Sequence, residues 1–203
     1  MIDRRVFLST LSALAMISAP ALAEDSPAPE VIEMTLGSDD APITMIEYAS
    51  FTCPHCANFH KDVFPRLRED YIDTGKVKFI YREVYFDRVG LWASIVARCG
   101  GEEKFFGISS QIFSEFKSWF VPKDMAATAD NLRRYGRVAG LTDDQLNACL
   151  TDEGNARALV GWFQENAKTD EITATPSFVI DGEKVSNKPY EDLKAILDRK
   201  LAG

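Results

Sequence analysis

The sequence has few of the features that mark a nucleic-acid or nucleotide-binding protein. Its 23 basic residues are outnumbered by 31 acidic ones, which gives a formal net charge of −8 over 203 residues. We therefore expect no nucleic-acid partner, because the phosphate backbone attracts a surplus of basic charge. The chain also has no internal repeat, no low-complexity tract and no glycine-rich loop that could hold a phosphate. Its 46% hydrophobic content is enough for one or two packed units.

An apolar run long enough to cross a bilayer is missing near the start of the chain. Residues Val6 to Ile17 are mostly apolar, follow Arg4 and Arg5, and precede Ala21-Leu22-Ala23. A membrane span needs about 20 apolar residues, so this order predicts a cleaved signal peptide over 1–23 rather than an anchor. We expect export to the periplasm. The paired arginines also fit a twin-arginine signal, so that route and the general secretory (Sec) route both stay open.

Cysteine is scarce, and two of the four cysteines form one closely spaced pair, Cys53-Pro54-His55-Cys56. The preceding stretch, 43–48, is almost continuously apolar, which predicts a central strand that is covered on both faces. Pro54 suits the first position of a helix, so Cys53 should be its N-cap. There its sulfur could accept hydrogen bonds from the backbone N–H groups of His55 and Cys56, beside the positive end of the helix dipole. Such surroundings lower a cysteine pKa from about 8.5 to roughly 3.5–7.5 and favour the reactive thiolate.

A metal site and a structural disulfide are two alternative roles for this pair, and the sequence favours neither. A zinc site needs four ligands, and Cys99, Cys149 and His60 provide no second closely spaced pair. A purely structural disulfide between Cys53 and Cys56 would close too small a loop to stabilise much. His55 could be an ordinary surface histidine, but between the two cysteines we expect its partial charge to act on Cys53.

A second motif lies far downstream, Thr175-Pro176-Ser177-Phe178, and opens a short apolar strand. Together with Cys53-Pro54-His55-Cys56 it resembles the DsbA family of thioredoxin-fold thiol-disulfide oxidoreductases, and the resemblance covers nearly all of the chain after the signal peptide. The resemblance implies that Cys53 is the attacking cysteine and Cys56 the resolving one. It also implies that Thr175 precedes a cis-proline, Pro176, which faces the disulfide. A trans bond is the alternative, because only about 5–6% of X-Pro bonds are cis.

Glu47 lies inside the apolar strand, six residues before Cys53. By the same resemblance it is a buried acid that assists proton transfer at the inner sulfur. The alternative is a carboxylate that tilts to solvent at the strand end. His60 differs from the family pattern, because the prototype has an acid near this position.

The fold class that follows is α/β, a thioredoxin fold with an inserted all-helical domain. Strands are predicted over 31–36, 76–85, 177–180 and 183–186, with a hairpin turn at Asp181-Gly182 and an amphipathic helix from Tyr190 to Leu201. Pro65 should kink the helix that begins at Pro54. The thioredoxin-like domain would comprise 24–87 and 169–203, and the helical domain 88–168.

Within 88–168 the apolar residues recur with helical spacing. Gly100-Gly101 should end one helix, and Leu141-Thr142 with Gln145-Leu146 predicts a capping box that starts another at Thr142. Cys99 and Cys149 lie on apolar faces of these helices. We predict a structural disulfide between them, with two buried free thiols as the alternative.

The function expected is that of a periplasmic dithiol oxidase that donates the Cys53–Cys56 disulfide. The resemblance implies reduced exported proteins as substrates and a membrane quinone reductase of the DsbB type as reoxidant. We expect a monomer, and no cofactor or metal besides the redox-active disulfide. Two alternatives remain, a disulfide reductase or isomerase that a membrane electron donor keeps reduced, and a non-catalytic chaperone with the same fold.

Overall fold

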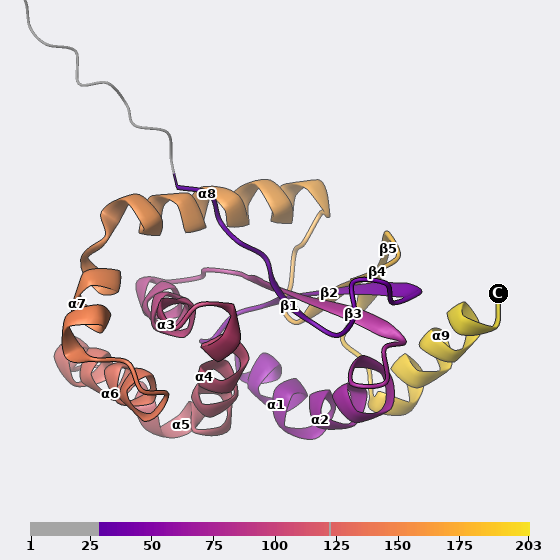
Figure 1. Cartoon of the computed structure of the whole chain (residues 1–203), viewed down its shortest axis with the longest axis horizontal. Coiled ribbons are helices and arrows are strands. Elements are labelled where there is room, and N and C mark those ends of the chain that lie inside the picture. Colours follow the sequence, from indigo (N-terminus) through magenta and orange to yellow (C-terminus); the bar gives the residue numbers. More distant parts are fainter. Residues whose placement is uncertain (1–28, 122) are drawn as a thin grey trace, which may run out of the picture.

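The computed structural model describes residues 29–121 and 123–203, so the expected signal peptide lies outside the described residues. The described parts contain a sheet flanked by helices (Figure 1). The strands are β1 (Met34–Leu36), β2 (Ile43–Ala49), β3 (Val77–Glu83), β4 (Ser177–Ile180) and β5 (Glu183–Ser186). The helices are α1 (Pro54–Asp62), α2 (Phe64–Leu67), the π-helical turn η1 (Arg68–Ile72), α3 (Arg88–Cys99), α4 (Glu102–Ser114), α5 (Phe116–Trp119), α6 (Met125–Val138), α7 (Asp143–Thr151), α8 (Glu153–Thr169) and α9 (Tyr190–Ala202).

The strand before the cysteine pair is the centre of the sheet, whose order is β1-β3-β2-β4-β5. β2 runs parallel to β3, while β1, β4 and β5 each run antiparallel to the strand they pair with. Side chains of a strand alternate between the two faces, so Met45 and Glu47 point to one face of β2 and Ile46 and Tyr48 to the other. Both faces are covered, as the apolar sequence predicted.

The two faces of the sheet are covered by different helices (Figure 1). On one face α1 packs against β4, with the rings of Phe59 and Phe178 4.9 Å apart. On the other face lies α8, whose Phe163 packs against a small cluster that includes Tyr48 and Val179. Burial of these apolar side chains holds the central strand between two layers.

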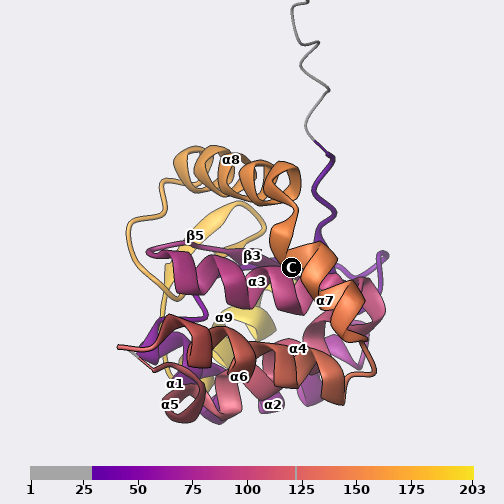
Figure 2. The ribbon, with the colours of Figure 1, turned by 90° about the vertical axis from the view of Figure 1, so that its left-hand side faces the viewer.

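In the described residues between β3 and β4 the regular elements are helices, and α3 is central among them (Figure 2). α3 ends at Cys99, directly before Gly100-Gly101, and α7 starts with the predicted capping box. In that box Gln145 N donates to Thr142 Oγ1, and Thr142 N donates to Gln145 Oε1. Buried apolar residues of both helices, among them Val96 of α3 and Leu146 of α7, share one continuous core with the sheet.

Pro65 has a stronger effect than the expected kink. α1 ends at Asp62, and a separate short helix, α2, begins at Phe64 with Pro65 in its first turn. A proline lacks the N–H needed inside a helix but fits a first turn, so the chain ends one helix and begins another.

The ends of the other strands differ slightly from the sequence-based expectation. β1 and β3 are shorter than 31–36 and 76–85, whereas β4 and β5 match the prediction. Asp181 and Gly182 both have positive φ, 48° and 80°, as a type I′ hairpin turn requires. None of the helices in the described part of the chain is both long and apolar enough to cross a membrane.

Candidate active site

The first turn of α1 presents the cysteine pair at the end of the central strand. Cys53 is the N-cap with extended backbone angles, and Pro54 is the first helical residue, as predicted. Cys53 N donates to the carbonyl of Ser50 at 3.1 Å, which ties the cap to the loop after β2. Both cysteines are free thiols and both are buried, Cys56 completely.

The Cys53 sulfur does not make the expected N-cap hydrogen bond. Instead its thiol donates to the carbonyl oxygen of Thr175 at 3.5 Å. Thr175 is joined to Pro176 by a cis peptide bond directly before β4. The two motifs, more than 100 residues apart in sequence, therefore meet at the sulfur of Cys53.

The surroundings separate the two thiols in acidity. The pKa of Cys53 is lowered from 9.0 to about 5, chiefly because the Cys56 thiol donates a hydrogen bond to its sulfur. The Thr175 side chain and the backbone amides of Cys56 and His55 act in the same direction, while burial opposes them. The pKa of Cys56 is raised, first by burial, then by its bond to Cys53 and by the charge of Glu47. The pair is thus poised as an outer thiolate and an inner thiol.

The His55 side chain plays a smaller part than the sequence suggested. It is exposed, and its backbone amide rather than its imidazole is among the leading causes of the lowered pKa of Cys53.

Glu47 is completely buried, so its carboxylate does not tilt to solvent. Its Oε2 lies 3.0 Å from Nε2 of His60, which is close enough for an ion pair. Neither of these two atoms has a hydrogen-bond partner, so the groups are close to one another but are not aligned for a hydrogen bond. His60 itself is stacked on Phe113, with ring centroids 4.1 Å apart and planes 9° from parallel.

The position of His60 against Glu47 was missed by the sequence reasoning, although a signal was present. His60 follows Cys56 by four residues, and residues four apart lie on the same helix face. This spacing could have identified His60 as a site residue, one helical turn after the buried Cys56.

The helical segment also fixes the loop that precedes Cys53. Thr52 Oγ1 donates to Asp87 Oδ2 at 3.0 Å, and Asp87 Oδ1 caps α3 by accepting from Gly90 N. No local pattern in the sequence indicates this contact, because Thr52 and Asp87 are 35 positions apart.

Cys99 and Cys149 form the second disulfide, with Sγ atoms 2.09 Å apart and Cα atoms 5.9 Å apart. The bridge joins the end of α3 to α7 and closes a separation of 50 residues. It links helices and is separate in sequence from the reactive pair.

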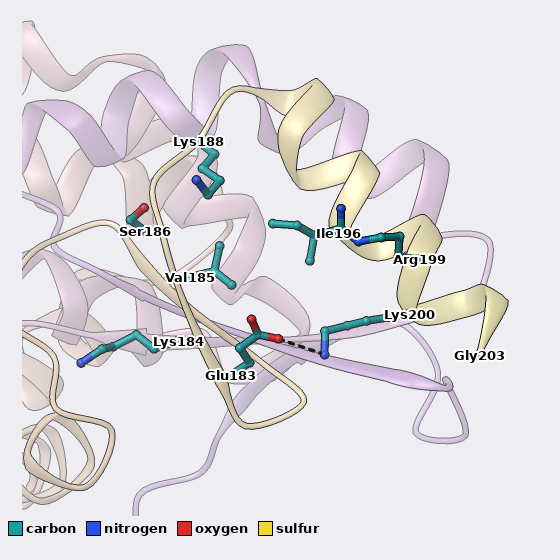
Figure 3. A pocket seen from close by; sticks show the side chains of 9 residues that line it. All are labelled: Glu183, Lys184, Val185, Ser186, Lys188, Ile196, Arg199, Lys200 and Gly203. Atoms are coloured by element: carbon teal, nitrogen blue, oxygen red, sulfur yellow. Dashed lines mark ion pairs between the residues drawn. The ribbon is translucent and has the colours of Figure 1, made fainter.

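A hollow between β5 and α9 contains none of the predicted site residues (Figure 3). Four basic residues line it, Lys184, Lys188, Arg199 and Lys200, and Nζ of Lys200 lies 3.6 Å from Oε2 of Glu183. The chemistry of the cysteine pair lies elsewhere, at the start of α1.

Comparison with known proteins agrees with the fold. Residues 30–199 match the family model described as Thioredoxin. The crystal structure of Wolbachia pipientis alpha-DsbA1 is 30% identical with a TM-score of 0.78, over 87% of this chain and 94% of that one. Disulfide bond formation protein D of Bacillus subtilis is 27% identical over 83% of this chain and 77% of its own length.

A relative in Rickettsia bellii, which bears the name of a protein-disulfide oxidoreductase, is 31% identical over 83% of this chain. The chain spans 64% of the length of that relative.

A thioredoxin-type sheet that presents an acidic outer cysteine, a buried inner cysteine and a cis-proline defines a class of dithiol proteins built for disulfide exchange. Within that class, the chain belongs to the DsbA family of thioredoxin-fold thiol-disulfide oxidoreductases.

Proposed function

We propose that the protein oxidises pairs of thiols in exported proteins by donating the Cys53–Cys56 disulfide. The observation that carries this direction is the pKa of Cys53, lowered to about 5 next to an inner cysteine whose pKa is raised. A thiolate that is stable at neutral pH stabilises the reduced pair, and a stabilised reduced form makes the disulfide a stronger oxidant.

The exchange would take place in two steps. A substrate thiolate attacks Sγ of Cys53 in the oxidised pair, the Cys53–Cys56 bond breaks, and the sulfur of Cys56 takes the electron pair and a proton. A second substrate thiolate then attacks the substrate sulfur of the mixed disulfide and releases Cys53 as a thiolate. The substrate loses two electrons and gains a disulfide, and the protein holds two electrons as a Cys53 thiolate and a Cys56 thiol.

Pro176 and Thr175 lie beside the reacting sulfur and would bound the site at which a substrate chain contacts it. We propose that the cysteine pair works without a separate cofactor or metal. A membrane quinone reductase of the DsbB type would return the pair to the disulfide, and the pattern of residues 1–23 supports export to the periplasm. Recovery of mature protein that begins at Glu24 from a periplasmic fraction would support this location, and a cytoplasmic protein with residues 1–23 retained would contradict it.

The decisive experiment is equilibration of the protein with glutathione, combined with oxidation of a reduced two-cysteine peptide. An oxidase should have a potential well above that of thioredoxin, about −270 mV, and toward the value of about −120 mV known for DsbA. Peptide oxidation should be lost in both Cys53→Ser and Cys56→Ser, because neither variant can form the Cys53–Cys56 disulfide. With oxidised glutathione as the oxidant, Cys56→Ser should accumulate a mixed disulfide between Cys53 and glutathione, because no resolving cysteine displaces it. A potential near that of thioredoxin would assign the protein to the reductases or isomerases, and an unreactive Cys53 would favour a non-catalytic chaperone.

A further inference from the structure

Several buried polar atoms behind the cysteine pair have no hydrogen-bond partner. Buried polar groups nearly always have one, so each exception points to a cause such as bound water or a role in chemistry. In residues 29–121 and 123–203 these atoms are Glu47 Oε1 and Oε2, His60 Nε2, Tyr81 Oη, Ser109 Oγ and Arg133 Nε. All except the Arg133 atom belong to one group of neighbouring side chains that begins next to Cys56.

The group starts at the inner cysteine. The charge of Glu47 raises the pKa of Cys56, so the carboxylate and the thiol lie within electrostatic reach of one another. Glu47 Oε2 is 3.0 Å from His60 Nε2. Tyr81 is the β3 residue directly paired with Glu47 of β2, and its hydroxyl is buried with them. Cys56, Glu47 and His60 therefore form a sequence of neighbouring groups, each of which can hold a proton.

His60 also lines a cavity of about 360 Å³ that reaches the surface. Tyr81 and Ser109 line its inner part, and the exposed residues Lys61 and Arg68 line its mouth. A volume of this size holds several water molecules, at about 30 Å³ each, and polar groups without partners are the kind that bind them. The cavity thus offers a path for protons from His60 to solvent.

We propose that His60 passes protons between Glu47 and the water of this cavity, so that the buried Cys56 gains and loses its proton by way of Glu47 and His60. The inference rests on the proposed function, because Cys56 needs a proton only when the disulfide opens. As the Cys53–Cys56 bond breaks, Cys56 takes the electron pair and a proton from the Glu47 carboxyl group. His60 returns a proton to Glu47 and takes one from cavity water, and reoxidation reverses each transfer. Because His60 acts through Glu47, it is a positioning residue.

Groups of both charge signs face His60. The Glu47 carboxylate lies on one side of the ring, and the cations of Lys61 and Arg68 lie at the cavity mouth. α4 contributes the uncharged Ser109 and Phe113. The titratable groups around the ring are Cys56 and Lys61 of α1, Glu47 of β2, Tyr81 of β3 and Arg68 of η1.

The test is the pH dependence of disulfide opening in full-length oxidised protein. Dithiothreitol in excess reduces the Cys53–Cys56 bond, acid quenching and alkylation count the released thiols, and each rate is divided by the concentration of the attacking thiolate. In the wild type we expect the corrected rate to change with pH in a single step. His60→Phe keeps a ring on Phe113 but has no ring nitrogen. We expect its reduction rate to be about 100-fold lower, which is the low end of the contribution of a positioned general acid or base. We also expect its rate to show no pH-dependent step.

Two further variants separate proton transfer from packing. His60→Gln keeps a polar group without an ionisable one and should lose the same step, which serves the test if His60→Phe does not fold. Phe64 packs on the His60 ring, with centroids 4.8 Å apart, and carries no proton itself. Phe64→Leu therefore alters the packing and the wall of the same cavity but leaves every proton-carrying group in place, and it should keep the wild-type pH profile. The pKa of Cys53 should remain near 5 in all three variants.

An unchanged pH profile in both His60 variants would overturn the relay. The relay would also be overturned if the His60 variants and Phe64→Leu all lost the same fraction of the reduction rate at every pH. Failure of the wild type to exchange disulfides with dithiothreitol at all would instead contradict the proposed function.

Discussion

At the scale of single residues, the acidity of Cys53 depends most on its partner cysteine. Its pKa is about 5 because the Cys56 thiol donates to it, with the Thr175 side chain and two backbone amides adding to the effect. We predict that alkylation of the reduced protein will show one thiol that still reacts below pH 6 and titrates near pH 5. Cys56→Ser keeps a donor and should leave that value nearly unchanged, whereas Cys56→Ala removes it and should raise the pKa of Cys53. A wild-type thiol that titrates near 8.5, the value of an ordinary cysteine, would contradict the activated nucleophile.

For Cys53, part of the site can be predicted from the sequence and part cannot. Cys53-Pro54 predicts an N-cap cysteine with a lowered pKa, because proline at the first helical position is a local rule. The largest cause, the thiol of Cys56, depends on how two side chains turn toward each other, which spacing alone does not settle. The ion-pair distance between Glu47 and His60 is harder still to predict, since it requires the packing of α1 on β2.

At the scale of elements, local signals placed starts and stops well. Gly100-Gly101 ends α3, and the capping box of Thr142 starts α7, because both depend on residues within one turn. The sequence did not predict which element the apolar face of each helix packs against. The helical spacing of apolar residues within 88–168 indicates that each helix buries one face. That Phe163 of α8 packs against the sheet, on the face opposite α1, follows from long-range packing.

The disulfide between α3 and α7 is the element-scale feature with the clearest energetic consequence. Closing a loop of 50 residues stabilises the fold, by the loop-entropy model, by up to roughly 4 kcal/mol. We predict that Cys99→Ala with Cys149→Ala lowers Tm by as much as about 8–16 °C, at 2–4 °C for each kcal/mol in a chain of this size. Each single variant should lose as much as the double one, because either change removes the whole bridge. Additive losses, measured by thermal unfolding, would show that the two side chains act separately.

At the scale of the whole molecule, the sheet and the helical segment share one hydrophobic core. An energy change at the cysteine pair is therefore expected to appear in the cooperative unfolding of the chain. The redox state of the pair should then be measurable as a difference in global stability.

The sign of that difference follows from the two shifted pKa values. The pKa of Cys53 is lowered from 9.0 to about 5, so it stabilises the reduced form increasingly as pH rises from 5 toward 9, and this contribution is lost as pH falls through 5. The raised pKa of Cys56 has no effect below its ordinary value of 9.0 and reduces stability above it. In the oxidised form the Cys53–Cys56 disulfide adds little to the folding stability, because it closes too short a loop.

We therefore predict that the reduced protein has the higher Tm at pH 7 and that the advantage disappears near pH 4. The measurement is thermal unfolding of both forms at the two pH values, with the Cys99–Cys149 bridge kept intact and verified by thiol counting. Cys53→Ser with Cys56→Ser, treated in the same way, should melt at one temperature whether or not reductant was added. An oxidised form that melts higher at pH 7 would contradict the oxidase assignment and favour a reductase, because the energy that stabilises the Cys53 thiolate in folding is the same energy that makes its disulfide oxidising.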